Sequence, residues 1–132
     1  MNNVLTIIPI IGAIALLYTF WFSKWVANRD AGTDRMKRIA GYITEGAMAF
    51  LKAEYKRLAW FVVIVAVLLA VTSTGENTSP LIALSFAVGA VCSGLAGFIG
   101  MRVATKANVR TANAARSSLN QALNVAFRGG SV

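Results

Sequence analysis

Histidine is absent from this sequence, and Cys92 is its single cysteine. One thiol leaves no disulfide framework, and without histidine neither a Cys/His zinc site nor a Ser-His or Cys-His nucleophile pair can form. Cys92 lies in a long uncharged run, so we expect it to act as a small apolar residue inside a helix. Hydrolytic or redox chemistry of these common kinds is excluded.

Charge is also scarce, and acidic charge most of all. Only 14% of the 132 residues are charged and 57% are hydrophobic, whereas soluble domains carry roughly a quarter charged residues. The chain has too little polar surface to cover the apolar side chains of a soluble globule. The carboxylates are scattered along the chain. They are Asp30, Asp34, Glu45, Glu54 and Glu76.

Three apolar runs predict membrane-spanning helices. No charged residue occurs within 4–23, and about 20 residues of helix cross the hydrocarbon core of a bilayer. A second run follows Arg57, and a third, opened by Pro80, ends before Arg102. The predicted fold is therefore all-α and transmembrane, with spans at about 4–24, 58–75 and 79–101. A cleaved signal peptide is a poor alternative for the first run, because no cation precedes it.

Thirteen Lys and Arg residues against five Asp and Glu residues give a formal net charge of +8. The thirteen cations are confined to two segments, which follow the first and the third run. By the positive-inside rule, both segments, about 25–57 and 102–128, are predicted to be cytoplasmic. The N-terminus and the short turn at Glu76 then face the other side. Anionic lipid headgroups are the expected partners of this charge. Nucleic acid is not, since no surface of stacking aromatics accompanies it.

Both cytoplasmic segments have helical periodicity. In the first, apolar residues recur three, four and seven positions apart from Met36, and Thr33 or Asp34 can cap the helix start. No residue up to Thr74 forces a break, so one long helix is predicted to continue into the second span. In the second segment, a helix is predicted to begin after Asn108 or Thr111 and to carry a stripe of small and apolar residues. The stripe is Ala112, Ala115, Leu119, Ala122, Leu123 and Ala126, with Arg110 and Arg116 facing away.

Small residues follow one face of the third run. They are Ser85, Gly89, Ser93 and Gly97, with Gly94 and Gly100 beside them. This spacing lets a second helix approach closely. A phosphate-binding loop is not favoured for these glycines, because the run lacks a Gly-Lys-Ser/Thr ending. An apolar rise at 129–132 is expected to start a fourth span, which makes the chain part of a larger polytopic helical bundle.

Two stretches resemble the membrane-bound ion-translocating inorganic pyrophosphatases. These are Glu45-Gly46-Ala47-Met48-Ala49-Phe50-Leu51-Lys52-Ala53-Glu54-Tyr55 and the sequence from Gly100 to Arg116, GMRVATKANVRTANAAR. The stretch from Leu123 to Gly130 is similar to the start of that family's fourth helix. The resemblance covers the chain from Thr33 onward. It implies a homodimeric pump that couples hydrolysis of inorganic pyrophosphate to translocation of H+ or Na+. It also implies an external N-terminus, a Mg2+ requirement and, in some members, a K+ requirement.

The catalytic motifs of that family are missing from the sequence. Its Asp-rich motifs hold Mg2+ around pyrophosphate, but helical spacing alone cannot bring Asp30, Asp34, Glu45 and Glu54 together. We therefore assign no catalytic, cofactor-binding or metal-binding residue here. We expect the chain to be an inactive N-terminal scaffold whose partner is the remainder of the same polypeptide. Two alternatives stay open at this stage: a complete small polybasic membrane protein with an assembly or binding role, and an accessory subunit of another transporter.

Overall fold

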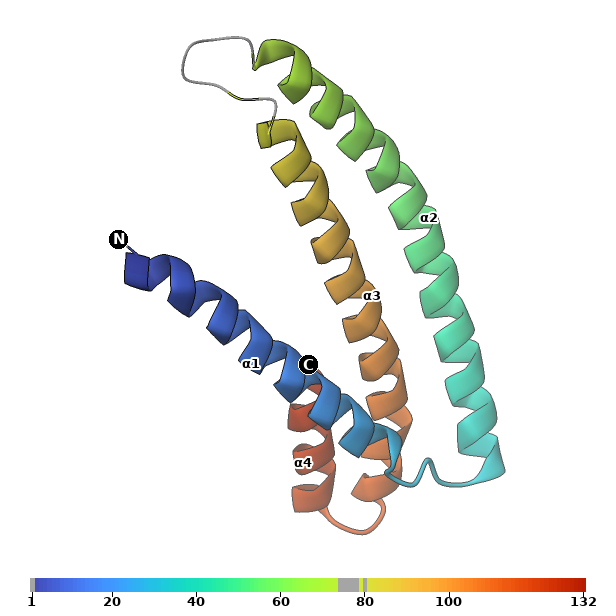
Figure 1. Cartoon of the computed structure of the whole chain (residues 1–132). Helices are drawn as coiled ribbons and strands as arrows, with labels where there is room; N and C mark the ends of the chain where they lie inside the picture. The colour runs from blue at the N-terminus through green and yellow to red at the C-terminus, as the bar shows by residue number, and fades with distance from the viewer. Residues whose placement is uncertain (1, 74–78, 80) are drawn as a thin grey trace. The chain divides into compact units, whose positions relative to one another are not determined.

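The structure is a computed structural model that describes residues 2–73, 79 and 81–132, with side chains from residue 7 onward. It contains four helices and, within these residues, no strand. They are α1 (Asn2–Ala27), α2 (Asp34–Thr72), α3 (Leu81–Ala115) and α4 (Leu119–Gly130) (Figure 1). The expected all-α fold is confirmed. The predicted turn at Glu76 and the helix start at Pro80 lie outside the described residues.

Three helices are long and apolar enough to cross a membrane: Ile7–Ala27 of α1, α2 and α3. Their apolar side chains project outward, as on Leu16 and Trp21 of α1, which are 70% and 73% exposed. In a bilayer such side chains face lipid or other transmembrane helices, so their exposure is consistent with an integral membrane protein. The positions at which each helix enters and leaves the bilayer stay predictions.

The second helix is continuous, as predicted. It begins after Thr33, whose hydroxyl accepts a hydrogen bond from the backbone N–H of Met36 at 3.4 Å. Asp34 occupies the first turn, where a carboxylate is favoured by the helix dipole. Gly41 and Gly46 do not interrupt the helix. Their cost in helix propensity, about 1 kcal/mol each, is offset by the helix-forming residues around them.

The chain divides into two compact units, one of Glu45–Ile99 and one of Met1–Thr44 with Gly100–Val132. In the first of these, the hydroxyl of Tyr55 on α2 donates a 2.7 Å hydrogen bond to the carbonyl of Gly94 on α3. A Cβ at Gly97 would lie 2.8 Å from the same hydroxyl. Gly94 and Gly97 thus leave room for the ring and hydroxyl of Tyr55, and a close approach of two helices along the small residues stays a prediction. A Cβ at Gly89 would meet no atom of another part of the described chain within 4 Å.

The other unit has a small core between the C-terminal end of α1, the second half of α3, and α4. Its buried residues include Val26, which is fully buried, and Val103, Ala107, Ala122, Val125 and Gly129. On α4 the buried positions 122, 125 and 129 follow the helical repeat. Figure 1 shows α4 beside α1. A Cβ at Gly129 would lie well inside van der Waals contact with the Cβ of Ala107, so α3 and α4 approach through these two residues.

The prediction of one helix from Asn108 or Thr111 to Ala126 is wrong. α3 runs unbroken through both residues to Ala115, and the chain turns before α4 begins at Leu119. Ser118 has extended backbone angles (φ −160°, ψ 131°), and its hydroxyl accepts from the N–H of Gln121. This is the geometry of a helix N-cap. The serine therefore stabilises a break that the apolar periodicity does not reveal.

This break also changes which face is buried. Leu119 and Leu123 of the predicted stripe are 72% and 44% exposed, whereas Ala122 is buried together with Val125. Gly129 and Gly130 are the last two residues of α4, and Ser131 caps it through a backbone N–H bond to Phe127. A membrane span that starts at 129–132 stays a prediction.

Adjacent glycines at the end of α4 provide a direct test of this packing. We expect Gly129→Ala to reduce the free energy of unfolding by about 1–3 kcal/mol, because the new methyl group overpacks Ala107. Gly130→Ala should change it by less than about 0.5 kcal/mol, since nothing lies within 4 Å of its Cβ position. Thermal unfolding in detergent micelles, followed by circular dichroism, measures both. Equal Tm values for the two variants would contradict the packing of α4 on α3.

Candidate functional site

The carboxylates and the thiol of the described residues form no metal-binding cluster. No group of three or more His, Cys, Asp or Glu side chains in them could hold a metal ion. Asp34 forms an ion pair with Lys37 at 3.4 Å on the surface of α2. Cys92 lies within the helix α3, as predicted, and its free thiol is exposed. This donor set does not fit Mg2+, which needs several converging oxygen ligands.

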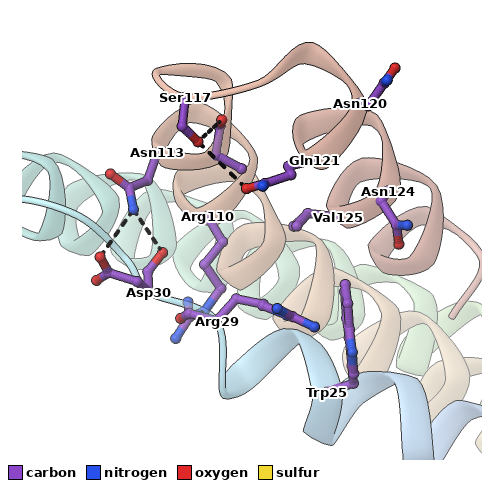
Figure 2. A pocket seen from close by; sticks show the side chains of 11 residues that line it. Trp25, Arg29, Asp30, Arg110, Asn113, Ser117, Asn120, Gln121, Asn124 and Val125 are labelled. Carbon is purple, nitrogen blue, oxygen red and sulfur yellow. Dashed lines mark hydrogen bonds between the residues drawn. The ribbon is translucent and has the colours of Figure 1, made fainter.

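The main polar feature is a groove of about 530 Å³ at the C-terminal end of α1. Its walls come from the last turn of α1, the segment that follows it, the end of α3, and α4. Figure 2 shows the lining side chains. They are Trp25, Arg29, Asp30, Arg110, Asn113, Ala114, Ser117, Asn120, Gln121, Asn124 and Val125. We call this feature the α1 groove. It combines cationic, amide and aromatic groups next to a candidate membrane span.

Arg110 of α3 holds the end of α1. Its guanidinium donates to the carbonyls of Ala27 through Nη2 and of Arg29 through Nε, both at 2.9 Å. Nη1 donates to the carbonyl of Lys106 one turn back on α3, also at 2.9 Å. The last carbonyls of a helix lack partners within the helix and carry partial negative charge. A planar cation with several fixed donors therefore satisfies them well.

The segment after α1 is fixed by Asn113 and Asp30. The amide of Asn113 donates to the carbonyl of Asp30 at 3.3 Å and to its carboxylate at 3.2 Å. The other carboxylate oxygen accepts from the N–H of Gly32 at 2.9 Å. That backbone bond is the main cause that lowers the pKa of Asp30 below its ordinary value, with smaller contributions from Asn113, Lys37 and Arg110. Asp30 is therefore an ionised, hydrogen-bonded turn residue.

Gly32 completes this turn with a positive φ of 81°. Side chains rarely adopt that conformation, and a Cβ here would also lie 2.7 Å from Asn113 Oδ1 and from Met36 Sδ. The turn between α1 and α2 is thus specified by glycine on one side and by α3 on the other.

Two arginines lie close to the indole ring of Trp25: Arg29, which lines the groove, and Arg128, which is not among its lining residues. The guanidinium carbon of Arg29 is 4.0 Å from the centroid of the Trp25 ring, and that of Arg128 on α4 is 4.3 Å from it. Arg128 also lies 5.4 Å from the ring of Phe22. Such cation–π contacts are worth about 0.5–1 kcal/mol at exposed sites. They bring two positive charges together at the end of α1.

Sequence reasoning missed this arrangement. It predicted Arg110 to face away from the stripe but gave it no partner, and it assigned no role to Trp25, Arg29 or Asn113. Each of the long-range bonds joins residues more than 80 positions apart, which no local pattern reports. The available signal was the end of α1 itself, which has no C-capping glycine immediately after it and therefore needs another group for its carbonyls.

The role of Arg110 can be measured against a second arginine near the end of α3. We expect Arg110→Lys to reduce the free energy of unfolding by about 1–2 kcal/mol, because an ammonium cannot reach three carbonyls at once. Arg116→Lys should cost less than about 0.5 kcal/mol, because Arg116 is exposed and, among the described residues, no side-chain bond ties it to α1. Denaturation in micelles, with hydrogen exchange at the last turn of α1, measures both. The assignment fails if the two variants lose equal stability.

Comparison with known proteins gives the family. Residues 13–132 match the family of the inorganic H+ pyrophosphatases. A putative K+-stimulated pyrophosphate-energized sodium pump of Clostridium tetani is 54% identical over 121 residues, which are 92% of this chain and 17% of that protein. A K+-insensitive pyrophosphate-energized proton pump 2 of Moorella thermoacetica is 48% identical over 126 residues, 96% of this chain and 18% of the pump.

A further relative, a K+-insensitive pyrophosphate-energized proton pump of Methanosarcina mazei, is 40% identical over all of this chain and 19% of its own length. No solved structure matches. The chain thus spans less than a fifth of each of these relatives. Matches of this length and identity extend through all four helices, and the chain belongs to the inorganic H+ pyrophosphatase family.

Proposed function

We propose that these residues form the N-terminal membrane scaffold of a pump that couples hydrolysis of inorganic pyrophosphate to ion translocation. The observation that carries the proposal is the family match over 13–132, together with three helices long enough to span a membrane. The relatives bear the names of pyrophosphate-energized pumps. A complete small polybasic membrane protein is not favoured, because nearly the whole chain aligns with proteins several times its length.

In this proposal the chemistry belongs to parts of the pump outside this chain. The described residues offer no carboxylate cluster for Mg2+, so Mg2+ and pyrophosphate would bind elsewhere in the polypeptide, and no step of hydrolysis is assigned to these side chains. The named relatives include both sodium and proton pumps, both K+-stimulated and K+-insensitive. The transported ion and a K+ requirement therefore stay open. A homodimer is the proposed assembly.

The scaffold has a proposed orientation. The N-terminus and the segment around Glu76 lie on the non-cytoplasmic side, while 25–57 and 102–128 are cytoplasmic. The distribution of Lys and Arg supports this arrangement, since twelve of the thirteen cations lie in the segments assigned to the cytoplasm and the thirteenth, Lys24, directly precedes the first of them. The α1 groove then lies at the cytoplasmic membrane surface, next to anionic headgroups.

The scaffold assignment predicts that the 132-residue chain alone is inactive. Reconstituted with Mg2+ and pyrophosphate, it should release no more phosphate than empty vesicles, because the described residues hold no carboxylate cluster for the substrate–metal complex. The full-length gene product, assayed in the same vesicles, is the positive control. Robust pyrophosphate hydrolysis by the chain alone would contradict the proposal, and so would a full-length product that hydrolyses none.

Orientation can be tested with two engineered thiols. In a Cys92→Ala background, Glu76→Cys should react with a membrane-impermeant maleimide added outside intact cells. Arg35→Cys, in the first basic segment, should react only after the cells are opened. The reverse pattern would show that the topology is inverted.

A further inference from the structure

On the proposed topology, Trp25 lies at a membrane surface. Trp25 lies two residues before the end of the candidate span Ile7–Ala27. Indole rings concentrate at the level of lipid headgroups, where an apolar ring with a polar N–H is favoured. The guanidiniums of Arg29 and Arg128 lie 4.0 Å and 4.3 Å from this ring. On that topology, both charges are held at headgroup level.

These two guanidiniums have no acidic partner. In the described part of the chain, neither forms an ion pair with a carboxylate or donates a side-chain hydrogen bond. Because both lie close to one ring, they are no more than about 8 Å apart and repel each other. An anion that accepts hydrogen bonds from both guanidiniums reduces that repulsion. Phosphate suits this position, since guanidinium and phosphate form paired hydrogen bonds.

The remaining charges of the α1 groove do not oppose an anion strongly. The carboxylate of Asp30 accepts hydrogen bonds from Gly32 and Asn113, and the charges of Lys37 and Arg110 partly offset its own. Asn120 and Asn124 of α4 add amide donors and acceptors to the groove wall. A volume of about 530 Å³ holds a polar headgroup as well as its phosphate.

An apolar path leads away from the groove along α1. Leu17 and Trp21 precede Trp25 at intervals of four residues, on the same helical face, and they are 70% and 73% exposed. A free phosphate or pyrophosphate would gain nothing from this surface, whereas an acyl chain would cover it. The cationic end and the apolar face together match a phospholipid.

We infer that Arg29 and Arg128, held on Trp25, bind the phosphate of an anionic phospholipid with a hydroxylated headgroup, such as phosphatidylglycerol. The headgroup hydroxyls contact the amides of α4, and one acyl chain runs along Leu17 and Trp21. The inference rests on the proposed position of the α1 groove at the membrane surface. It is independent of the pump's catalytic cycle.

The test uses the full-length gene product in detergent, titrated with phosphatidylglycerol and followed by native mass spectrometry. We expect Arg29→Gln or Arg128→Gln to weaken binding of the tightest lipid about 5-fold, and the double variant about 25-fold. Arg35→Gln removes an equal charge from the exposed start of α2 and should leave the affinity unchanged. Phosphatidylcholine should bind the native protein more weakly. Equal losses in the double variant and in Arg35→Gln would overturn the inference.

Competition separates the sources of phosphate. Inorganic phosphate or pyrophosphate in excess should not displace the lipid, and displacement would show that the groove takes a free anion instead. A second measurement does not depend on the arginine variants folding. The fluorescence of Trp25 is the difference between the native protein and Trp25→Phe. Brominated phosphatidylglycerol should quench this fluorescence more strongly than brominated phosphatidylcholine does. Equal quenching by the two lipids would overturn the assignment. Both experiments omit catalysis, so their failure leaves the proposed pump function standing.

Discussion

The three hydrogen bonds of the Arg110 guanidinium are the interaction on which the unit around α4 depends. The last carbonyls of α1 lie at the end of a candidate membrane span, where an unpaired carbonyl is costly. Arg110 donates to the carbonyl of Ala27, the last residue of α1, to that of Arg29 in the segment after it, and to that of Lys106 on its own helix. One side chain thus ends α1 and ties it to α3. It also fixes the backbone that carries Trp25 and Arg29.

The short helix α4 completes that arrangement. Twelve residues of helix are marginal in water on their own, so α4 depends on its buried face. Gly129 permits the close approach to Ala107, and Ser118 begins the helix at the position that directs Ala122 and Val125 inward. The same orientation carries Arg128 to Trp25. The α1 groove is therefore a product of tertiary packing between three helices.

The fold was largely predictable because its determinants are local. Uncharged runs predict the spans, and the absence of a breaker after Thr33 predicts the continuous α2. The break between α3 and α4 was missed although a local signal exists, since Ser118 and Gln121 have the spacing of a capping box while apolar periodicity continues across them. The α1 groove was not predictable. Arg110 donates to backbone carbonyls, which every residue has. The sequence therefore does not show which carbonyls are its partners.

The contact between Tyr55 and Gly94 shows where sequence reasoning about the membrane reaches its limit. Tyr55 belongs to the predicted cytoplasmic segment 25–57, whereas Gly94 lies seven residues before the C-terminal end of the predicted span 79–101. A 2.7 Å hydrogen bond nevertheless joins them. Seven residues of helix correspond to about 10 Å. The contact therefore draws the neighbouring Lys56 and Arg57 toward the bilayer, and such side chains reach the surface by extending their long stems. The sequence shows where charged residues lie along the chain, but their depth in the bilayer depends on which residues pack against one another.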